Sequence, residues 1–165
     1  MQIVKDKTPA EVAPKTQETN LRARVLIIEG RFYEKIADEL VAGAIAVIEE
    51  RGASYDRISV PGALEIPQVL AQAVDTGRWD GAVALGCVIR GETAHYDIVC
   101  NNANHWLMEV AIRHRMPVGN GILTVENEAQ ALARAEGGRD GKGGDAARAC
   151  LKLIEIAHAF QGQGA

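Results

Sequence analysis

Short apolar runs alternate with segments of helical periodicity from Arg24 onward. The runs are RVLIIEG (24–30), YDRISV (55–60), GAVALGCVI (81–89) and PVGNGILTVE (117–126), and each has the length and composition of a strand. Strands that alternate with helices form right-handed β-α-β units. The sequence therefore predicts an α/β fold, a three-layer, doubly wound α/β/α sandwich in which helices cover both faces of a four-stranded parallel sheet.

The helices are expected in the intervening segments. After the first run, apolar residues recur at helical spacing until Gly52 ends the pattern. The later helices are expected at about 65–74, 94–115, 127–135 and 145–160, with EGGRDGKGG (136–144) as a loop between the last two. Residues 21–160 are thus expected to form one domain, residues 161–165 a short tail.

The first twenty residues have a different character. They carry two prolines, charges of both signs and no apolar stretch of signal-peptide length. We expect a flexible arm that becomes ordered only against a neighbouring chain.

Charge and cysteine usage exclude several classes of partner. The net charge of −4 gives no basic field for nucleic acid. Cys87, Cys100 and Cys150 form no C-x-x-C pair, which indicates reduced thiols in a cytoplasmic protein. The polar residues of the long helix, three asparagines with His105 and Glu109, exclude a membrane span there.

The long helix at 94–115 carries more apolar surface than one sheet can cover. One stripe consists of Val99, Ala103, Trp106 and Val110, but apolar side chains continue beyond it, at Ile98, Leu107, Met108 and Ile112. Two explanations remain open. Either the helix is buried within its own chain, or neighbouring subunits cover the remainder.

A ligand site in such a fold lies beyond the carboxyl ends of the strands. The loop after the third strand is the most informative one. Gly91 permits a tight turn, and Glu92 and Thr93 present backbone amides at a helix start, where an anion is favoured. Alternatively, Thr93 is a simple helix cap. His95 is either an ordinary helix residue or a proton-transfer group.

Other candidates at the same edge are weaker alone. Phe32 is either a core aromatic or a stacking surface for a flat ring, and Glu65 and Arg134 each have an ordinary helical explanation. GGRDGKGG fails as a phosphate-binding P-loop, since Glu136 stands where the first glycine belongs. The four histidines have no close-spaced acidic or thiol partners, so there is no metal signature.

Five ordered motifs together resemble the 6,7-dimethyl-8-ribityllumazine synthase family. They are GRF (30–32), VPGALEIP (60–67), LGCVIRGETAHYD (85–97), PVGNGILTVEN (117–127) and QALARA (130–135). The resemblance implies a flavodoxin-like sandwich assembled into homopentamers, or into a 60-subunit shell of pentamers, with sites shared between adjacent subunits. It implies a transferase of riboflavin biosynthesis that condenses 5-amino-6-(D-ribitylamino)uracil with 3,4-dihydroxy-2-butanone 4-phosphate, and that uses no cofactor or metal.

The resemblance also implies residue roles. His95 matches the proton-transfer histidine, and Glu92, Thr93 and a neighbouring subunit's Arg134 match the phosphate site. The ribitylaminouracil would contact a larger set, namely Phe32, Ala63, Leu64, Glu65, Cys87, Val88, Ile89 and Asn120.

Two positions depart from the family pattern. Asn120 stands where many members have an aromatic residue, so hydrogen bonding would replace some stacking. Lys142 approximates a loop lysine of the family, but the surrounding GGRDGKGG is unusual. A non-catalytic flavin- or lumazine-binding protein on the same scaffold is the alternative function. A response-regulator-like domain is disfavoured, because the third strand ends in Arg90 rather than in an acidic cluster.

Overall fold

The computed structural model describes residues 20–162, and its core is a four-stranded parallel sheet. The strand order is β2-β1-β3-β4. The strands are β1 (Arg24–Gly30), β2 (Ser54–Val60), β3 (Gly81–Ile89) and β4 (Val118–Val125), each within one residue of the predicted run. The predicted arm falls outside the described residues over positions 1–19, as does the tail over 163–165.

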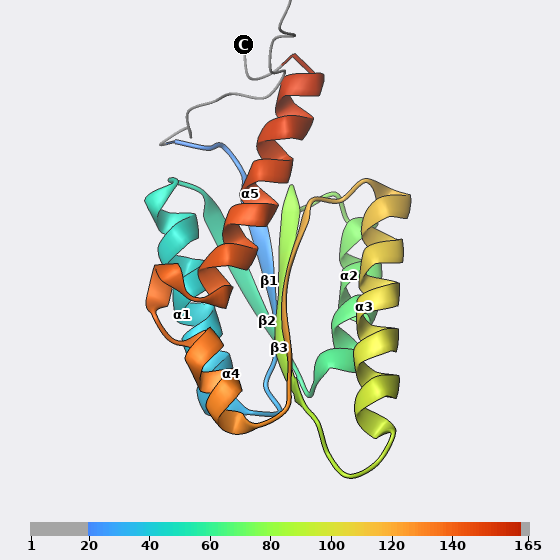
Figure 1. Ribbon diagram of the computed structural model, residues 1–165. Helices are drawn as coiled ribbons and strands as arrows, with labels where there is room; N and C mark the ends of the chain where they lie inside the picture. The colour runs from blue at the N-terminus through green and yellow to red at the C-terminus, as the bar shows by residue number, and fades with distance from the viewer. Residues whose placement is uncertain (1–19, 163–165) are drawn as a thin grey trace, which may run out of the picture.

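Helices cover both faces of this sheet, which confirms the three-layer α/β/α fold (Figure 1). One face carries α1 (Glu34–Glu50), α4 (Glu128–Ala135) and α5 (Lys142–Phe160), and the other carries α2 (Ile66–Val74) and α3 (His95–His114). Short 3-10 turns, η1 (Ala63–Glu65) and η2 (Gly138–Asp140), precede α2 and α5. All four strands run in one direction, so their carboxyl ends meet at one edge, at the bottom of Figure 1.

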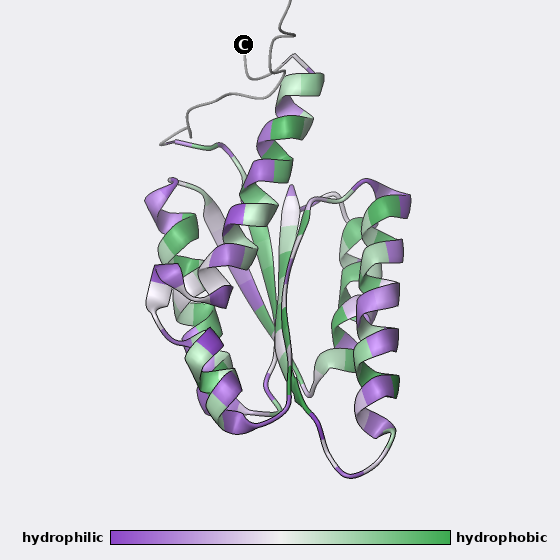
Figure 2. Ribbon diagram, in the orientation of Figure 1, coloured by the Kyte–Doolittle hydropathy of each residue, from purple (hydrophilic) through white to green (hydrophobic). Residues whose placement is uncertain are grey.

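Each sheet face buries its own hydrophobic core. Along β1, Val25 and Ile27 pack towards α1 and α5, whereas Leu26 and Ile28 pack towards α2 and α3. Because both faces are covered, the central strands are apolar at most positions, and much of their length is green in Figure 2; Glu29 of β1 is a buried exception.

The start of α5 differs from the sequence prediction. The helix begins at Lys142, three residues before the expected start at 145, and so includes Gly143 and Gly144. A Cβ at Gly143 would overlap the backbone carbonyl of Leu40 in α1, and one at Gly144 would overlap that of Arg139. These glycines therefore allow the close approach of α5 to its neighbours, although in the sequence they resemble a loop.

The predicted apolar stripe of α3 is partly wrong. The buried line follows Val99, Cys100, Ala103, Leu107 and Ala111, and Trp106 is 49% exposed. Ala103, Leu107 and Ala111 are spaced by four residues, so Leu107 takes the inward place predicted for Trp106.

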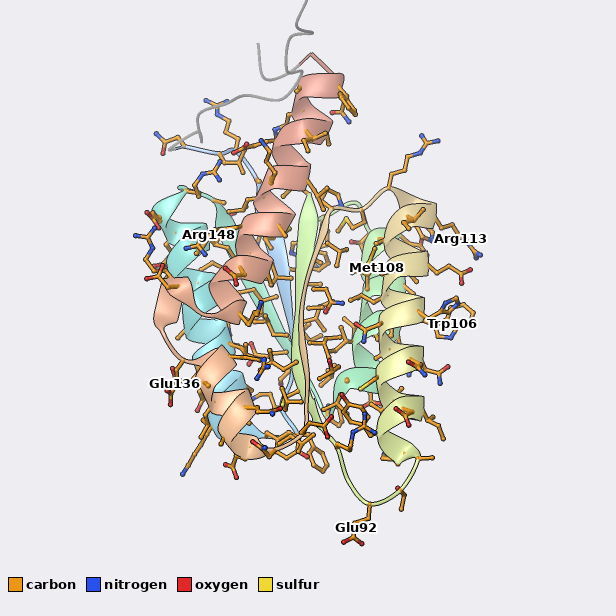
Figure 3. All side chains as sticks on the ribbon, in the orientation of Figure 1. Glu92, Trp106, Met108, Arg113, Glu136 and Arg148 are labelled. Atoms are coloured by element: carbon orange, nitrogen blue, oxygen red, sulfur yellow. The ribbon has the colours of Figure 1, made fainter. Side chains whose placement is uncertain are left out.

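The outward side of α3 carries exposed apolar residues among polar ones such as Asn101, His105 and Arg113. Ile98, Met108 and Ile112 are exposed there, and Trp106 points away from the sheet in Figure 3. The chain therefore does not bury this helix by itself, which is against the first of the two explanations given above.

Candidate active site

A cavity of about 300 Å³ lies at the carboxyl edge of the sheet. Three segments far apart in the sequence form its wall: the β1–α1 loop, the η1 turn after β2, and the end of β3 with the loop leading into α3. This is the edge at which the fold class places a ligand. Nine predicted site residues line it, namely Phe32, Ala63, Leu64, Glu65, Cys87, Val88, Ile89, Thr93 and His95.

Phe32 is not a core aromatic. Its side chain is 74% exposed, and its ring meets the Tyr33 ring edge to face, with centroids 4.9 Å apart. Tyr33 packs against the core beneath α1. An exposed ring that stands at a cavity, backed by a packed neighbour, is suited to stacking on a flat ligand.

The η1 turn forms the second wall. A Cβ at Gly30 would lie 3.1 Å from the carbonyl carbon of Gly62, so β1 and the turn approach closely. Ala63 is buried, and Leu64 and Glu65 are half-buried beside the cavity. Pro67 follows in the first turn of α2, where its missing N–H costs no hydrogen bond. This packing fixes the turn against the sheet.

The end of β3 supplies backbone and a thiol. Cys87 and Ile89 are half-buried, and Val88 is nearly buried. Burial raises the pKa of the Cys87 thiol to about 11, so the thiol stays protonated at neutral pH and is a poor nucleophile. The backbone N–H and C=O groups at this strand end, next to a neutral side chain, are suited to hydrogen bonding with the polar edge of a ring.

The loop from Arg90 to Ala94 is held at its two ends. The Arg90 guanidinium bonds Glu126 at the end of β4, with Nε to Oε1 at 3.1 Å, and lies 4.2 Å from the centre of the Tyr96 ring. Arg90 thus joins the start of the loop to the first turn of α3. Within the loop, Thr93 Oγ1 accepts a hydrogen bond from the His95 backbone N–H at 3.3 Å, which closes the turn before α3. The N-cap of α3 is Ala94, which makes no side-chain capping bond, so Thr93 is not the simple cap of the alternative reading.

Four other predicted site residues are not part of this cavity's lining within the described chain. Glu92 is exposed at the tip of the loop (Figure 3). Arg134, in the last turn of α4, is exposed and donates from Nη1 to the Gln130 carbonyl at 3.2 Å. Lys142 begins α5, with its Nζ 3.8 Å from Asp145 Oδ2.

Asn120 is the fourth of these residues, and it lies on β4, which is an edge strand. Its Nδ2 donates to Asn104 Oδ1 at 2.7 Å, and its Oδ1 accepts from the Ile122 N–H at 3.0 Å. The carboxamide is therefore held between β4 and α3.

Five further lining residues were assigned no ligand contact from the sequence, namely Tyr33, Gly62, Gly91, Tyr96 and Val99, although Gly91 was expected to form the turn. The first four lie inside or directly beside the motifs at the strand ends. Their position at the carboxyl edge of the sheet could therefore have indicated that they line the cavity. Val99 lies one helical turn after His95. Its place in the apolar stripe of the helix predicted that it is buried, but not that it lines the cavity.

The described residues carry neither a metal site nor a membrane helix. Between positions 20 and 162, no three His, Cys, Asp or Glu side chains are grouped so that they could hold a metal ion. Over the same range, every helix is too short or too polar to cross a bilayer.

The fold and the cavity define an α/β/α protein of the class that binds small molecules at the carboxyl edge of a parallel sheet. The 6,7-dimethyl-8-ribityllumazine synthase family model matches residues 22–158. The chain belongs to this family, and it is an enzyme of riboflavin synthesis, a transferase.

Individual relatives with this same name match the chain over nearly the whole length of both proteins. The 6,7-dimethyl-8-ribityllumazine synthase of Methylobacterium radiotolerans is 53% identical over 150 residues, which cover 90% of this chain and 92% of the relative. That of Bartonella bacilliformis is 51% identical over 147 residues, covering 88% and 97%. That of Methylorubrum populi is 48% identical over 162 residues, covering 95% and 96%.

Proposed function

We propose that the cavity at the carboxyl edge is where this enzyme condenses 5-amino-6-(D-ribitylamino)uracil with 3,4-dihydroxy-2-butanone 4-phosphate. The products are 6,7-dimethyl-8-ribityllumazine, phosphate and water. One observation carries the proposal: Phe32 of the β1–α1 loop lines the same cavity as Thr93 and His95, which lie together where the β3–α3 loop enters α3. A stacking ring, an anion-binding helix start and a proton carrier are the groups that this condensation needs.

The ribitylaminouracil would occupy the wall formed by β1, η1 and β3. Phe32 would stack on the pyrimidinedione, and the exposure of its ring supports this role. Residues 63–65 would contact the ribityl chain. The backbone of residues 87–89 would bond the polar edge of the ring, which the half-buried strand end supports.

The phosphate would bind where the loop enters α3. Glu92 and Thr93 would offer backbone amides, and Thr93 a hydroxyl, at the positive end of the helix dipole. Arg134 would come from a neighbouring copy and bind the anion with its planar fork. Its exposure at the end of α4, outside the lining of its own chain's cavity, supports this assignment.

Asn120 and Lys142 are the less supported members of the site. Asn120 would reach the bound ring from the neighbouring copy with the one amide hydrogen that its bonds to Asn104 and Ile122 leave over. Lys142 would have to leave its contact with Asp145 to meet an anion.

A shared site requires an assembly. We infer homopentamers in the cytoplasm, alone or as twelve pentamers in a 60-subunit shell. The exposed apolar side chains of α3 support burial against another copy, because several large apolar groups on one helix are seldom left in water. Particle mass in solution distinguishes the two sizes, and a monomer would contradict both.

The reaction would begin when the primary 5-amine attacks the ketone and forms an imine, with loss of water. His95 would then move protons while phosphate leaves, after which the ribitylamino nitrogen closes the second ring and a second water is lost. Holding both substrates in one cavity supplies much of the rate, because the bond-forming atoms are already aligned.

The test mixes the purified protein with both substrates and follows the fluorescent lumazine and the released phosphate. Equal amounts of the two products are expected. A non-catalytic flavin- or lumazine-binding protein would bind the lumazine and form none, and that result would contradict the proposal.

A further inference from the structure

Glu29 is a buried carboxylate to which the proposed chemistry gives no part. It is the second-last residue of β1, and its side chain is only 3% exposed. It shares the strand face of Val25 and Ile27, which belong to the core beneath α1. A carboxylate in such a place is costly unless charged partners and hydrogen bonds replace water.

Two arginines supply those partners. Arg57 of β2 donates to both carboxylate oxygens, from Nε to Oε2 and from Nη2 to Oε1, each at 2.9 Å. Arg31 donates from Nη1 to Oε1, also at 2.9 Å. The Glu29 carboxylate therefore joins β2 to the residue that follows β1.

Arg31 carries the connection into α1. Its Nε donates to Glu34 Oε2 at 2.8 Å, its Nη2 bonds Asp38, and its backbone N–H donates to the Val60 carbonyl at 3.0 Å. Tyr33, the N-cap of α1, makes no side-chain capping bond in the described chain. The Arg31 side chain thus joins the end of β1 to the first two turns of the helix.

Phe32 lies between these fixed points. Its ring is exposed and contacts the Tyr33 ring, so few side-chain contacts determine its direction. The backbone on either side decides where the ring stands. Arg31 holds that backbone on one side and the packed Tyr33 holds it on the other.

We propose that Glu29 is a positioning residue that acts through Arg31 to hold the Phe32 ring at the cavity before the pyrimidinedione binds. The proposal rests on the stacking role assigned to Phe32 above. Fold stability alone does not account for the carboxylate, because a buried ion pair contributes little more than well-packed apolar side chains of the same volume. A ring held in its binding position saves the free energy of ordering it on binding.

The test is a double-mutant cycle between Glu29 and Phe32, read as the dissociation constant of the lumazine product in a fluorescence titration. Glu29→Gln keeps the shape and removes the charge. We expect Glu29→Gln and Phe32→Ala each to weaken binding about tenfold, and the double variant to bind no more weakly than Phe32→Ala. Loss of packing alone would instead make the two effects multiply.

A matched control comes from the opposite end of the sheet. Asp56 holds Arg24 through a two-point pair at 2.7 and 2.9 Å, so Asp56→Asn also breaks an arginine–carboxylate pair of the sheet. It should bind lumazine as the wild type does. If Glu29→Gln does not fold, Arg31→Gln takes its place in the cycle, because it breaks the same connection at a more exposed residue.

The outcomes separate this inference from the proposed function. Wild-type binding by Glu29→Gln, or effects that multiply in the double variant, would overturn the inference while Phe32→Ala still weakened binding. Unchanged binding by Phe32→Ala would overturn the role assigned to Phe32, and the inference with it.

Discussion

The hydroxyl oxygen of Thr93 lies 3.3 Å from the backbone nitrogen of His95 and accepts its hydrogen bond. Both residues line the same cavity. The bond fixes the proposed anion-binding residue and the proposed proton carrier in one turn, so movement of the loop changes both together.

Replacement of His95 by alanine is expected to lower turnover at saturating substrates by about 10²-fold, since positioned proton transfer typically contributes that much or more. The KM of the phosphorylated substrate should change less. His114→Ala, at the other end of α3, is the matched control and should turn over normally. Wild-type turnover in His95→Ala would remove His95 from the mechanism.

Arg134→Ala is expected to raise the KM of the butanone phosphate at least about tenfold, because charge-assisted bonds to an anion are among the strong ones. The KM of the ribitylaminouracil should stay near its wild-type value. Arg134→Lys keeps the charge but lacks the planar guanidinium, so its KM for the butanone phosphate should lie between those of the wild type and Arg134→Ala. An unchanged KM in Arg134→Ala would mean that the phosphate site has been assigned to the wrong arginine.

A buried ion pair gives a prediction on stability. Arg51 at the end of α1 contacts Glu155 of α5, and both side chains are buried. Glu155→Ala removes this buried carboxylate from the Arg51 guanidinium and is expected to lower the free energy of unfolding by about 3–5 kcal/mol. The apolar pair Arg51→Met with Glu155→Leu should recover most of the loss. Denaturant unfolding at matched protein concentrations measures both, and equal losses in the two variants would contradict this account.

Asp56 gives a prediction on pH. Hydrogen bonds from Arg24 and then Trp79 lower the pKa of its carboxyl from 3.8 to about 2. Because the folded state has the lower pKa, the ionised carboxylate stabilises the fold above pH 4, and this contribution is lost as the pH falls towards 2. Asp56→Asn should therefore be less stable than the wild type at pH 7, and the difference should shrink at pH 2. Urea midpoints at the two pH values measure this, and a constant difference would contradict the assignment.

Most of the fold follows from local patterns. The strands of a parallel sheet are buried on both faces, so 24–30 and 81–89 stand out as apolar runs with sharp ends. The start of α5 was mispredicted because Gly143 is selected by its contact with Leu40, which no local pattern contains. Trp106 was misplaced because the side of α3 that faces the sheet depends on the packing of Leu107.

The lining of the cavity was predictable wherever its residues lie at strand ends. Position at the carboxyl edge, together with residue type, pointed to Thr93 and His95. Neither property pointed to the link from Glu29 through Arg31 to Phe32, because a carboxylate inside an apolar strand gains its partners only when β2 pairs with β1. The role proposed for Arg134 comes from family resemblance alone, since its partner would lie on another copy.

The most direct test of the shared site is complementation between inactive chains. His95→Ala and Arg134→Ala chains are co-expressed, purified as mixed assemblies and assayed with both substrates at a phosphate-substrate concentration where each variant alone is nearly inactive. If each site takes His95 from one copy and Arg134 from the next, random mixing restores about a quarter of the sites, and the activity rises well above that of either variant. An activity equal to the mean of the two variants would contradict the account, because it would show that both residues serve a site within a single chain.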